Sequence, residues 1–295
     1  MVNEIIKLTE PNENSIIIDA TFGFGGHSKA FYEIVKNGLI IGFEKNEMTY
    51  EIVKEMFKNY PRILIYNVGY ENMVEIIEKL GLLNKVDIVI FDLGLSSFLI
   101  ERSGLGFSYK RNEILDMRFS QKENKPLYQL LENLTQKEIE RILRNYGDIK
   151  NAYKISKAIL ERKSIKTTKD LVNILEKITP KNKLDKTLKK VFQAFRIYVN
   201  DEIENIKRGI LSAYKCLKVG GKIAVLSYHS IEDRVIKSFY KSPLFIPLLK
   251  KPLRPSNEEI LINPRARSAK LRILIKKWCF ISYQHLWFYF WVLVL

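Results

Sequence analysis

The sequence predicts an α/β fold in which a doubly wound parallel sheet carries an inserted helical domain. Short buried apolar runs that end in polar residues alternate with helical patterns, and the middle of the chain is helical and basic without a convincing buried strand. The expected strands are 16–18, 39–43, 62–68, 87–91 and 222–228, with a last strand at the sheet edge over 271–276.

The first expected strand leads into a glycine turn, which contains Gly23, Gly25 and Gly26 and precedes a helical pattern from Ser28 onward. Glycine lets the backbone approach a ligand closely, and a helix N-terminus offers unpaired N–H groups to an anion. The stretch therefore predicts a nucleotide-type cofactor loop. The alternative is a turn that only closes a tight connection between strand and helix.

Polar or aromatic residues follow four of the expected strands: Asp19, Glu44, Tyr70 and Asp92. In a doubly wound sheet, ligands bind outside the carboxyl ends of the strands, so these four side chains should line one crevice. Glu44 lies about twenty residues beyond the glycines, where a carboxylate holds a ribose diol in such folds. The alternative for Glu44 is an ordinary surface glutamate.

Between Gly104 and Lys190 the pattern changes to helices and charged loops, which predicts an insertion after the fourth strand. Its helices are expected over 137–146, 153–162 and 169–178, with Thr135 and either Thr167 or Thr168 as N-caps. One long helix over 192–217 and a glycine-rich exit are then expected to lead into the fifth strand.

The formal charge of the chain is +16, which suits a partner with a phosphate backbone. Residues 101–200 hold 23 Lys and Arg against 12 Asp and Glu, which makes the insertion the expected polyanion-facing part. A lysine-rich solvated surface is the alternative. Cys216 and Cys279 match no metal-ligand spacing, and the first residues contain no signal-peptide core. We therefore expect reduced thiols, a cytoplasmic location and no metal.

The last stretch, 278–295, is an atypical apolar tail that contains all three tryptophans and no Lys, Arg, Asp or Glu. At 18 residues it is barely long enough to span a bilayer, and polar residues interrupt it. A packed terminal segment or an out-of-frame gene end is favoured over a membrane anchor.

Several long strings resemble the bacterial 16S ribosomal RNA cytosine-N4 methyltransferase family, known as RsmH or MraW. The strings are DATFGFGGHS (19–28), DLGLSS (92–97), GFSYKRNEILDMR (106–118), FQAFRIYVNDEIE (192–204), GGKIAVLSYHSIEDRVIKSF (220–239) and NPRARSAKLR (263–272).

The resemblance implies a class I methyltransferase with a Rossmann-like sheet, which uses S-adenosyl-L-methionine to methylate the exocyclic N4 of a cytidine in the decoding region of 16S rRNA. The expected domains are a cofactor-binding methyltransferase domain over 1–103 and 191–277 and an inserted RNA-facing helical domain over 104–190. The implied partner is 16S rRNA in the small ribosomal subunit or its late precursor. No other protein partner is expected, and a homodimer is left open.

Position by position, the resemblance places cofactor contacts on residues of the loop and of the strand ends. They are Gly25, Gly26, His27, Glu44, Tyr70 and Asp92. Relatives usually have aspartate at the place of Glu44 and phenylalanine at that of Tyr70. Where relatives commonly have glutamine, this chain has Leu99, which offers only backbone hydrogen bonds.

For the chemistry, Asp92, Ser96 and Ser97 are the candidate catalytic residues. A cytosine amino group becomes nucleophilic when acceptors take its hydrogens; Asp92 either does this or only binds cofactor, with the two serines as substrate-side acceptors. The latter is slightly favoured. His229 is either a base or RNA contact, or a buried structural histidine.

Two further pairs have open roles near the start of the insertion. Asp116 and Arg118 either form an internal ion pair or contact the base. Phe107 and Tyr109 either stack on an extruded cytosine or belong to a core, which is the more frequent role of such aromatics.

Arginine binds two phosphate oxygens at once, so basic residues clustered in two of the strings are the candidate RNA contacts. They are Lys110, Arg111, Arg265, Arg267, Lys270 and Arg272. Two alternatives to the whole account stay open. One is another enzyme with this sheet, such as a small-molecule methyltransferase or an NAD-dependent dehydrogenase. The other is a non-catalytic RNA-binding ribosome assembly factor with a degraded methyltransferase fold.

Overall fold

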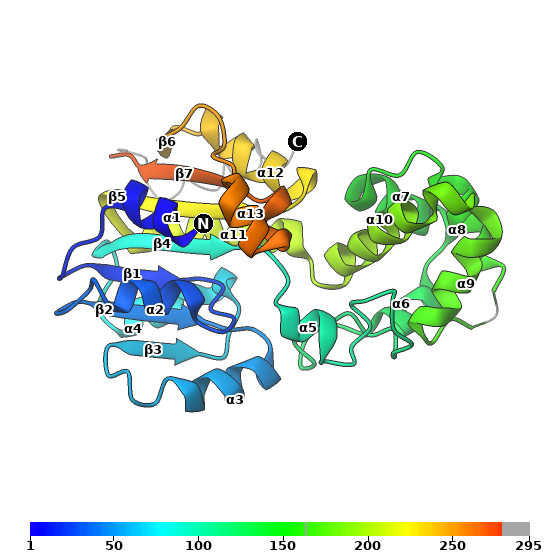
Figure 1. The fold of residues 1–295 in the computed structure, drawn as a ribbon, viewed down its shortest axis with the longest axis horizontal. Coiled ribbons are helices and arrows are strands. Elements are labelled where there is room, and N and C mark those ends of the chain that lie inside the picture. The colour runs from blue at the N-terminus through cyan, green and yellow to red at the C-terminus, as the bar shows by residue number, and fades with distance from the viewer. Residues whose placement is uncertain (163, 279–295) are drawn as a thin grey trace. The chain divides into compact units, whose positions relative to one another are not determined.

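The computed structural model describes residues 1–162 and 164–278 and divides the chain into two compact units (Figure 1). The sheet unit comprises Met1–Gly94 and the described residues from Ile203 onward, and the helical unit comprises Leu95–Glu202. The helical unit is thus an insertion into the sheet unit, and each is described by itself below.

The sheet unit contains one seven-stranded sheet in the order β3-β2-β1-β4-β5-β7-β6. The first five strands in the chain run parallel, whereas β7 is antiparallel to both of its neighbours. The strands are β1 (Ile16–Asp19), β2 (Leu39–Phe43), β3 (Ile63–Tyr66), β4 (Val86–Asp92), β5 (Leu217–Ser227), β6 (Phe245–Pro247) and β7 (Lys270–Lys276). This confirms the predicted α/β class with a doubly wound sheet.

Helices cover both faces of the sheet because successive side chains of its buried strands point to opposite sides (Figure 1). Ile17 packs with the residues of α1, α2 and α3, whereas the next residue, Ile18, packs with those of α4, α11 and α12. The α-helices of this unit are α1 (Val2–Thr9), α2 (Gly26–Tyr32), α3 (Glu47–Met56), α4 (Met73–Lys79), α11 (Glu202–Cys216), α12 (Ser230–Ser238) and α13 (Asn257–Ile262), and the 3-10 helices are η1 (Tyr70–Asn72), η2 (Phe239–Lys241) and η3 (Pro264–Ser268).

The expected edge position of the last strand is wrong. β7 lies between β5 and β6, and the three-residue β6 forms the edge. The sequence pattern missed β6 because it is short and ends in Pro247, which cannot donate a backbone hydrogen bond and therefore suits only an edge strand.

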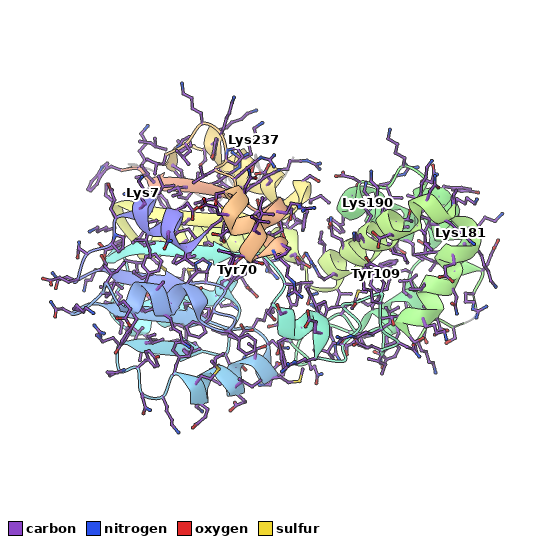
Figure 2. The ribbon with its side chains drawn as sticks, viewed as in Figure 1. Lys7, Tyr70, Tyr109, Lys181, Lys190 and Lys237 are labelled. Atoms are coloured by element: carbon purple, nitrogen blue, oxygen red, sulfur yellow. The ribbon has the colours of Figure 1, made fainter. Side chains whose placement is uncertain are left out.

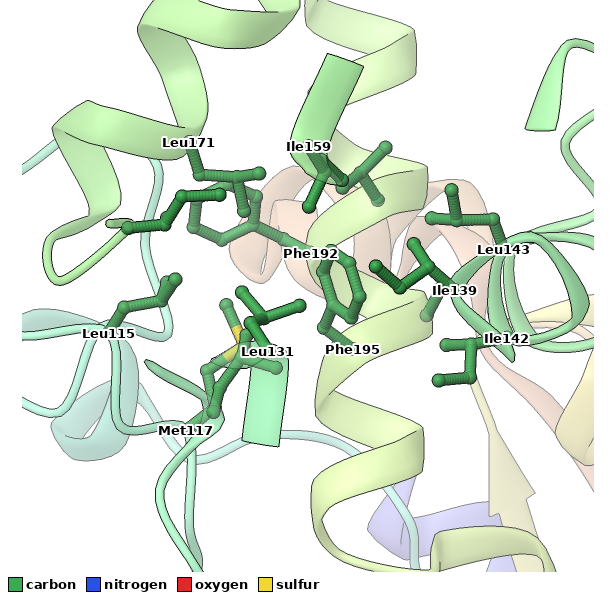
Figure 3. Packing of buried hydrophobic residues seen from close by; sticks show 14 of the residues in the cluster. Leu115, Met117, Leu131, Ile139, Ile142, Leu143, Ile159, Leu171, Phe192 and Phe195 are labelled. Atoms are coloured by element: carbon green, nitrogen blue, oxygen red, sulfur yellow. The ribbon is translucent and has the colours of Figure 1, made fainter. Parts of the chain in front are cut away.

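The helical unit buries its own apolar core, in which Phe192 and Phe195 of α10 lie among side chains from the surrounding helices and loops (Figure 3). Thr135 and Thr167 each cap a helix through a capping box, which confirms Thr135 and selects Thr167 over Thr168. Its helices are α5 (Ser97–Glu101), α6 (Leu127–Asn133), α7 (Gln136–Gly147), α8 (Ala152–Leu160), α9 (Thr168–Ile178) and α10 (Lys181–Val199).

The single long helix expected over 192–217 is wrong, since the chain breaks between α10 and α11. Asp201 has φ +48°, a left-handed conformation that interrupts a right-handed helix. The side chain of Asn200 donates to the Met117 carbonyl at 2.7 Å and accepts from Phe119 N at 2.7 Å, which anchors the end of α10 within the helical unit. A periodic apolar pattern continues through this break, so periodicity alone could not reveal it.

The helical unit is wider than the expected insertion over 104–190, because α5 and the whole of α10 contribute to its core. The expected tail begins at Trp278, and its remaining residues, including Cys279, lie outside the described residues. In the part of the chain that the structure describes, we find no helix long and apolar enough to cross a membrane.

Candidate functional site

The carboxyl ends of β1 and β4 lie side by side at the point where the strand order reverses. From β1 the chain proceeds outward to β2 and β3, and then returns to place β4 on the other side of β1. Ligands of open α/β sheets bind at such a switch point. Asp19 ends β1 and Asp92 ends β4, so both acidic groups lie at this position.

Asp92 connects the loop after β1 to the end of β4. Its backbone N–H donates to Thr21 Oγ1 at 2.6 Å, and its Oδ2 lies 3.4 Å from His27 Nε2. The sequence analysis did not single out Thr21, although it lies within the glycine-containing string. The structure thus brings Asp92 and His27 together, and Thr21 links Asp92 to the loop after β1.

Asp19 is buried and His27 is half-buried, and each has a buried polar atom with no hydrogen-bond partner among the described residues. These atoms are His27 Nδ1 and Asp19 Oδ1, while Asp19 Oδ2 accepts from Ser28 Oγ at 2.7 Å. Buried polar atoms are nearly always paired, so such a pair marks a place where a polar ligand fits. The residues present therefore suit a cofactor with hydrogen-bonding groups.

The titration behaviour of these two residues follows from burial and from each other. Burial raises the pKa of the Asp19 carboxyl, although the charge on His27 and the Ser28 hydroxyl oppose the rise. Burial alone would lower the pKa of His27, but the hydrogen bond to Asp92 and the charges of Asp19 and Asp92 outweigh it. The pKa of His27 is therefore raised above its ordinary value, which favours a charged imidazole beside Asp92.

Glu44 follows β2 and holds the glycine turn through backbone hydrogen bonds. Its Oε2 accepts from Gly23 N at 3.0 Å and its Oε1 accepts from Asn46 N at 2.8 Å. Burial raises the pKa of this carboxyl to about 7, although the two backbone N–H groups favour the charged form. A carboxylate fixed in this way retains acceptor capacity for the hydroxyls of a diol.

Gly25 is a glycine because of both its conformation and its surroundings. It has φ +71°, and a Cβ at this position would lie 2.2 Å from Cζ of Phe57. Gly25 is also the N-cap of α2, which begins at Gly26. The turn therefore packs closely against α3 and leads directly into the helix that carries His27.

Tyr70 starts η1 after β3 and packs edge-on against Phe91, with ring centroids 5.3 Å apart. A Cβ on Gly209 of α11 would lie 2.5 Å from the Tyr70 ring, so the glycine makes room for it. The structure places Tyr70 on the side of the sheet that α4 and α11 cover, and its role towards a cofactor stays a prediction (Figure 2).

Tyr228 is a site residue that the sequence analysis missed. It follows β5, and the Asp92 carboxylate acts electrostatically on its hydroxyl. Burial and the Asp92 charge raise the pKa of this hydroxyl, so it stays protonated as a donor. A Cβ on Gly94 would lie 2.7 Å from the Tyr228 ring, so this approach requires glycine there. The rule of polar residues at strand ends, applied to the fifth strand, would have found it.

His229 has a structural role in the sheet unit, which favours the structural alternative over a catalytic one. It is the N-cap of α12, where its Nδ1 accepts from Glu232 N at 3.4 Å and its Nε2 lies 2.9 Å from Glu232 Oε1. Glu232 closes the capping box by accepting from the backbone N–H of His229 at 3.3 Å.

In the helical unit, Ser96 is the N-cap of α5, and its Oγ accepts from Leu99 N at 3.2 Å. Ser97 is the first residue of α5 and is exposed. Leu99 lies in the core of this unit with 7% of its surface exposed, which explains a leucine at this position. The catalytic roles of Ser96 and Ser97 stay predictions.

Asp116 and Arg118 form the internal ion pair that was one of their two predicted roles. Arg118 Nε donates to Asp116 Oδ1 at 2.7 Å and Nη2 donates to Oδ2 at 2.8 Å, a bidentate arrangement. Phe107 is stacked on Phe119 within the core, which contradicts the hypothesis that Phe107 stacks on an extruded base. Tyr109 donates to Asp185 Oδ1 at 2.8 Å.

The six predicted RNA contacts divide into three groups. The side chains of Lys110 and Arg111 are exposed in the helical unit, and those of Arg265 and Arg267 are exposed in the sheet unit. Lys270 is half-buried.

Arg272 is buried, which contradicts direct contact between this residue and RNA. Only 4% of Arg272 is exposed, and its Nε donates to Asp233 Oδ1 at 2.7 Å. Lys270 donates to the other oxygen of Asp233 at 2.9 Å, and the Arg272 guanidinium lies over the Tyr240 ring. The two β7 cations thus join the strand to α12, and the sequence could not distinguish this from phosphate binding.

We predict that the affinity for S-adenosylmethionine rises as the pH increases through about 7, where Glu44 ionises in the folded protein. The sign follows because the carboxylate accepts hydrogen bonds from ligand hydroxyls and the protonated acid is a weaker acceptor. Calorimetric titration between pH 6 and 8 measures this. In Glu44→Gln the rise in affinity near pH 7 should disappear. The exposed Glu78→Gln is the matched control and should keep the rise. A rise of equal size in Glu44→Gln would contradict the assignment of the pH dependence to Glu44.

A second prediction concerns Asp233. Asp233→Asn should lower the free energy of unfolding by about 3 kcal/mol, because the buried Arg272 would lose its ionic partner. Urea denaturation measures the loss, and Asp233→Asn combined with Arg272→Met should recover most of it. If Asp233→Asn costs no more than an exposed control such as Glu75→Gln, the structural role of the pair is wrong.

Comparison with known proteins gives a consistent family match. A family model described as the MraW methylase family matches residues 1–277. The protein called ribosomal RNA small subunit methyltransferase H from Caldicellulosiruptor saccharolyticus is 38% identical over 293 residues, which cover 91% of this chain and 94% of that protein. The protein of the same name from a Hydrogenobaculum species is 40% identical over 263 residues, covering 87% and 88% respectively.

Among solved structures, an rRNA methylase from Streptococcus thermophilus aligns over 92% of each chain at 13% identity and a TM-score of 0.45. This likeness is too distant to carry an argument.

Proposed function

The chain belongs to the MraW methylase family, and from this premise we propose that it transfers a methyl group from S-adenosylmethionine to the exocyclic N4 of a cytidine in the decoding region of 16S rRNA. The enzyme is a methyltransferase with S-adenosylmethionine as its cofactor. We propose that it acts in the cytoplasm on the small ribosomal subunit or its late precursor.

The observation that carries the proposal is the convergence at the switch point of the sheet. The Asp92–His27 contact, the Glu44-bound glycine turn and the unpaired buried atoms of Asp19 and His27 lie on neighbouring strand ends. The Asp92–His27 contact and the Glu44-bound turn are both present, which argues against a degraded, non-catalytic fold.

S-adenosylmethionine supplies the methyl group from its sulfonium, and the main work of the enzyme is to orient the two reactants and exclude water. Glu44 would accept hydrogen bonds from the ribose hydroxyls, since Gly23 and Asn46 already fix its carboxylate. Gly25, Gly26 and His27 would contact the same cofactor from the turn, and Tyr70 from the end of β3.

As the new carbon–nitrogen bond forms, the carbon–sulfur bond of the methyl donor would break, and the amino nitrogen of cytosine would release a proton to solvent water. Asp92 would hold the cofactor near the reacting atoms, while Ser96, Ser97 and nearby backbone carbonyls would accept hydrogen bonds from the amino group. His27 would orient the Asp92 carboxylate, because its Nε2 lies 3.4 Å from Asp92 Oδ2. The exposed Lys110, Arg111, Arg265 and Arg267 would contact RNA phosphates.

The test is transfer of labelled methyl to small subunits that lack the modification, followed by nucleoside mapping. We predict label in N4-methylcytidine, and a loss of about 100-fold or more in rate for Asp92→Asn, because an oriented charged group at the reacting centre is removed. Exposed Glu78→Gln is the matched control and should keep full activity.

The absence of label with the native chain, despite cofactor binding, would favour the non-catalytic assembly factor. A parallel assay with free 16S rRNA decides whether the assembled subunit is needed, and size measurement in solution decides whether the active form is a homodimer.

A further inference from the structure

The helical unit contains a groove of about 560 Å³ that the site described above does not include. It lies where the loop between α7 and α8 faces the start of α10, and its floor includes the apolar side chains of Ile149 and Ile155. We call it the lysine groove, after the five lysines that line it: Lys150, Lys154, Lys183, Lys186 and Lys190.

The lysines come from two segments of the helical unit that face each other across the groove. Lys183, Lys186 and Lys190 recur at intervals of three and four along α10, which places them on one helix face. Lys150 and Lys154 lie on the opposing segment at the start of α8. Lys190, which is labelled in Figure 2, donates to the Asp148 carbonyl at 2.8 Å.

The positive charge of the groove has little local compensation. Among the described residues, no acidic side chain pairs with Lys150, Lys154, Lys183 or Lys186, and Asp148 is the one acidic residue in the lining. Asp185, also on α10, is already engaged by the Tyr109 hydroxyl and by Lys189. Like charges gathered in this way repel one another, and an anion would relieve the repulsion.

The N-termini of two helices at the groove also favour the binding of an anion. Asn151 and Pro180, the N-caps of α8 and α10, both line the groove and make no side-chain cap bond. Neither helix has an acidic residue in its first turn, whereas α7 and α9 begin with acidic capping boxes. Backbone N–H groups at these two ends therefore supplement the lysines.

We infer that the lysine groove binds the phosphodiester backbone of the RNA substrate. The inference rests on the proposed function in taking RNA as the substrate, and it adds a binding surface that the predicted contacts do not include. Flexible ammonium groups on two facing segments suit a run of phosphates without reading base identity. The apolar floor supports the lysine stems and leaves their charged ends at the opening.

The test compares two fourfold variants of the full chain. The groove variant carries Lys150→Gln, Lys154→Gln, Lys183→Gln and Lys186→Gln. The matched control carries Lys122→Gln, Lys137→Gln, Lys166→Gln and Lys169→Gln, which removes the same charge from the same unit outside the groove. All eight side chains are exposed, so both variants should fold, as circular dichroism and unchanged S-adenosylmethionine affinity would verify.

Binding of a fluorescent RNA hairpin that contains the cytidine is measured over a range of salt concentrations, without methyl transfer. The groove variant should lose about tenfold or more in affinity, and its slope of log affinity against log salt should fall by about 3, since each phosphate contact contributes about 0.7–0.9. Because no reaction is needed, failure of the methyl-transfer proposal would leave this readout intact.

Equal affinities and slopes in the groove and control variants would overturn the inference. It would also be overturned if the groove variant lost calorimetric binding of pyrophosphate and kept its RNA affinity, since the groove would then be a site for small anions.

Discussion

The arrangement at the switch point of the sheet depends on the contacts of Asp92. Its backbone N–H donates to Thr21 Oγ1, and its carboxylate lies 3.4 Å from His27 Nε2 and raises the pKa of the Tyr228 hydroxyl. These partners come from the loop after β1, the start of α2 and the end of β5, so one residue at the end of β4 fixes three segments. The position follows from topology, because β1 and β4 are neighbours at the reversal of strand order. Removing this carboxylate would leave the half-buried His27 imidazole without its acidic partner, which costs free energy.

A second constraint on this end of the sheet is that two carboxyl groups, those of Asp19 and Glu44, are largely removed from solvent. Asp19 and Glu44 both have a raised pKa because burial disfavours their charged forms, while backbone N–H groups oppose the rise for Glu44. Shifted pKa values of buried ionisable groups are typical of functional sites. The glycine turn allows the close packing: Gly25 lies against Phe57, and the turn is bound to Glu44 through Gly23. The residues proposed to bind the cofactor are thus also residues that hold the fold together.

Much of this could be predicted from the sequence, because buried parallel strands read as continuous apolar runs and their ends identify the crevice. The sequence pattern gave wrong predictions where contacts between distant residues determine the local structure. The break at Asp201 depends on Asn200 reaching Met117, which no periodicity encodes. Arg272 resembles an RNA contact in the sequence and is an internal partner of Asp233 in the structure, because charge alone does not say which way a strand residue faces. Tyr228 directly follows the fifth strand, so the rule that ligands bind at the carboxyl ends of strands applies to it as well.

The helical unit has its own hydrophobic core, and the lysine groove is made only of residues of this unit. Binding of RNA and binding of the cofactor can therefore be tested separately. The most direct test of the interaction between Asp92 and His27 is the pKa of His27, measured by NMR on histidine-labelled protein. The account predicts a value above 6.5 in the native chain, and a lower value in Asp92→Asn, because the hydrogen bond and charge that raise it would be lost. A His27 pKa at or below 6.5 that is unchanged in Asp92→Asn would contradict the central role of this pair.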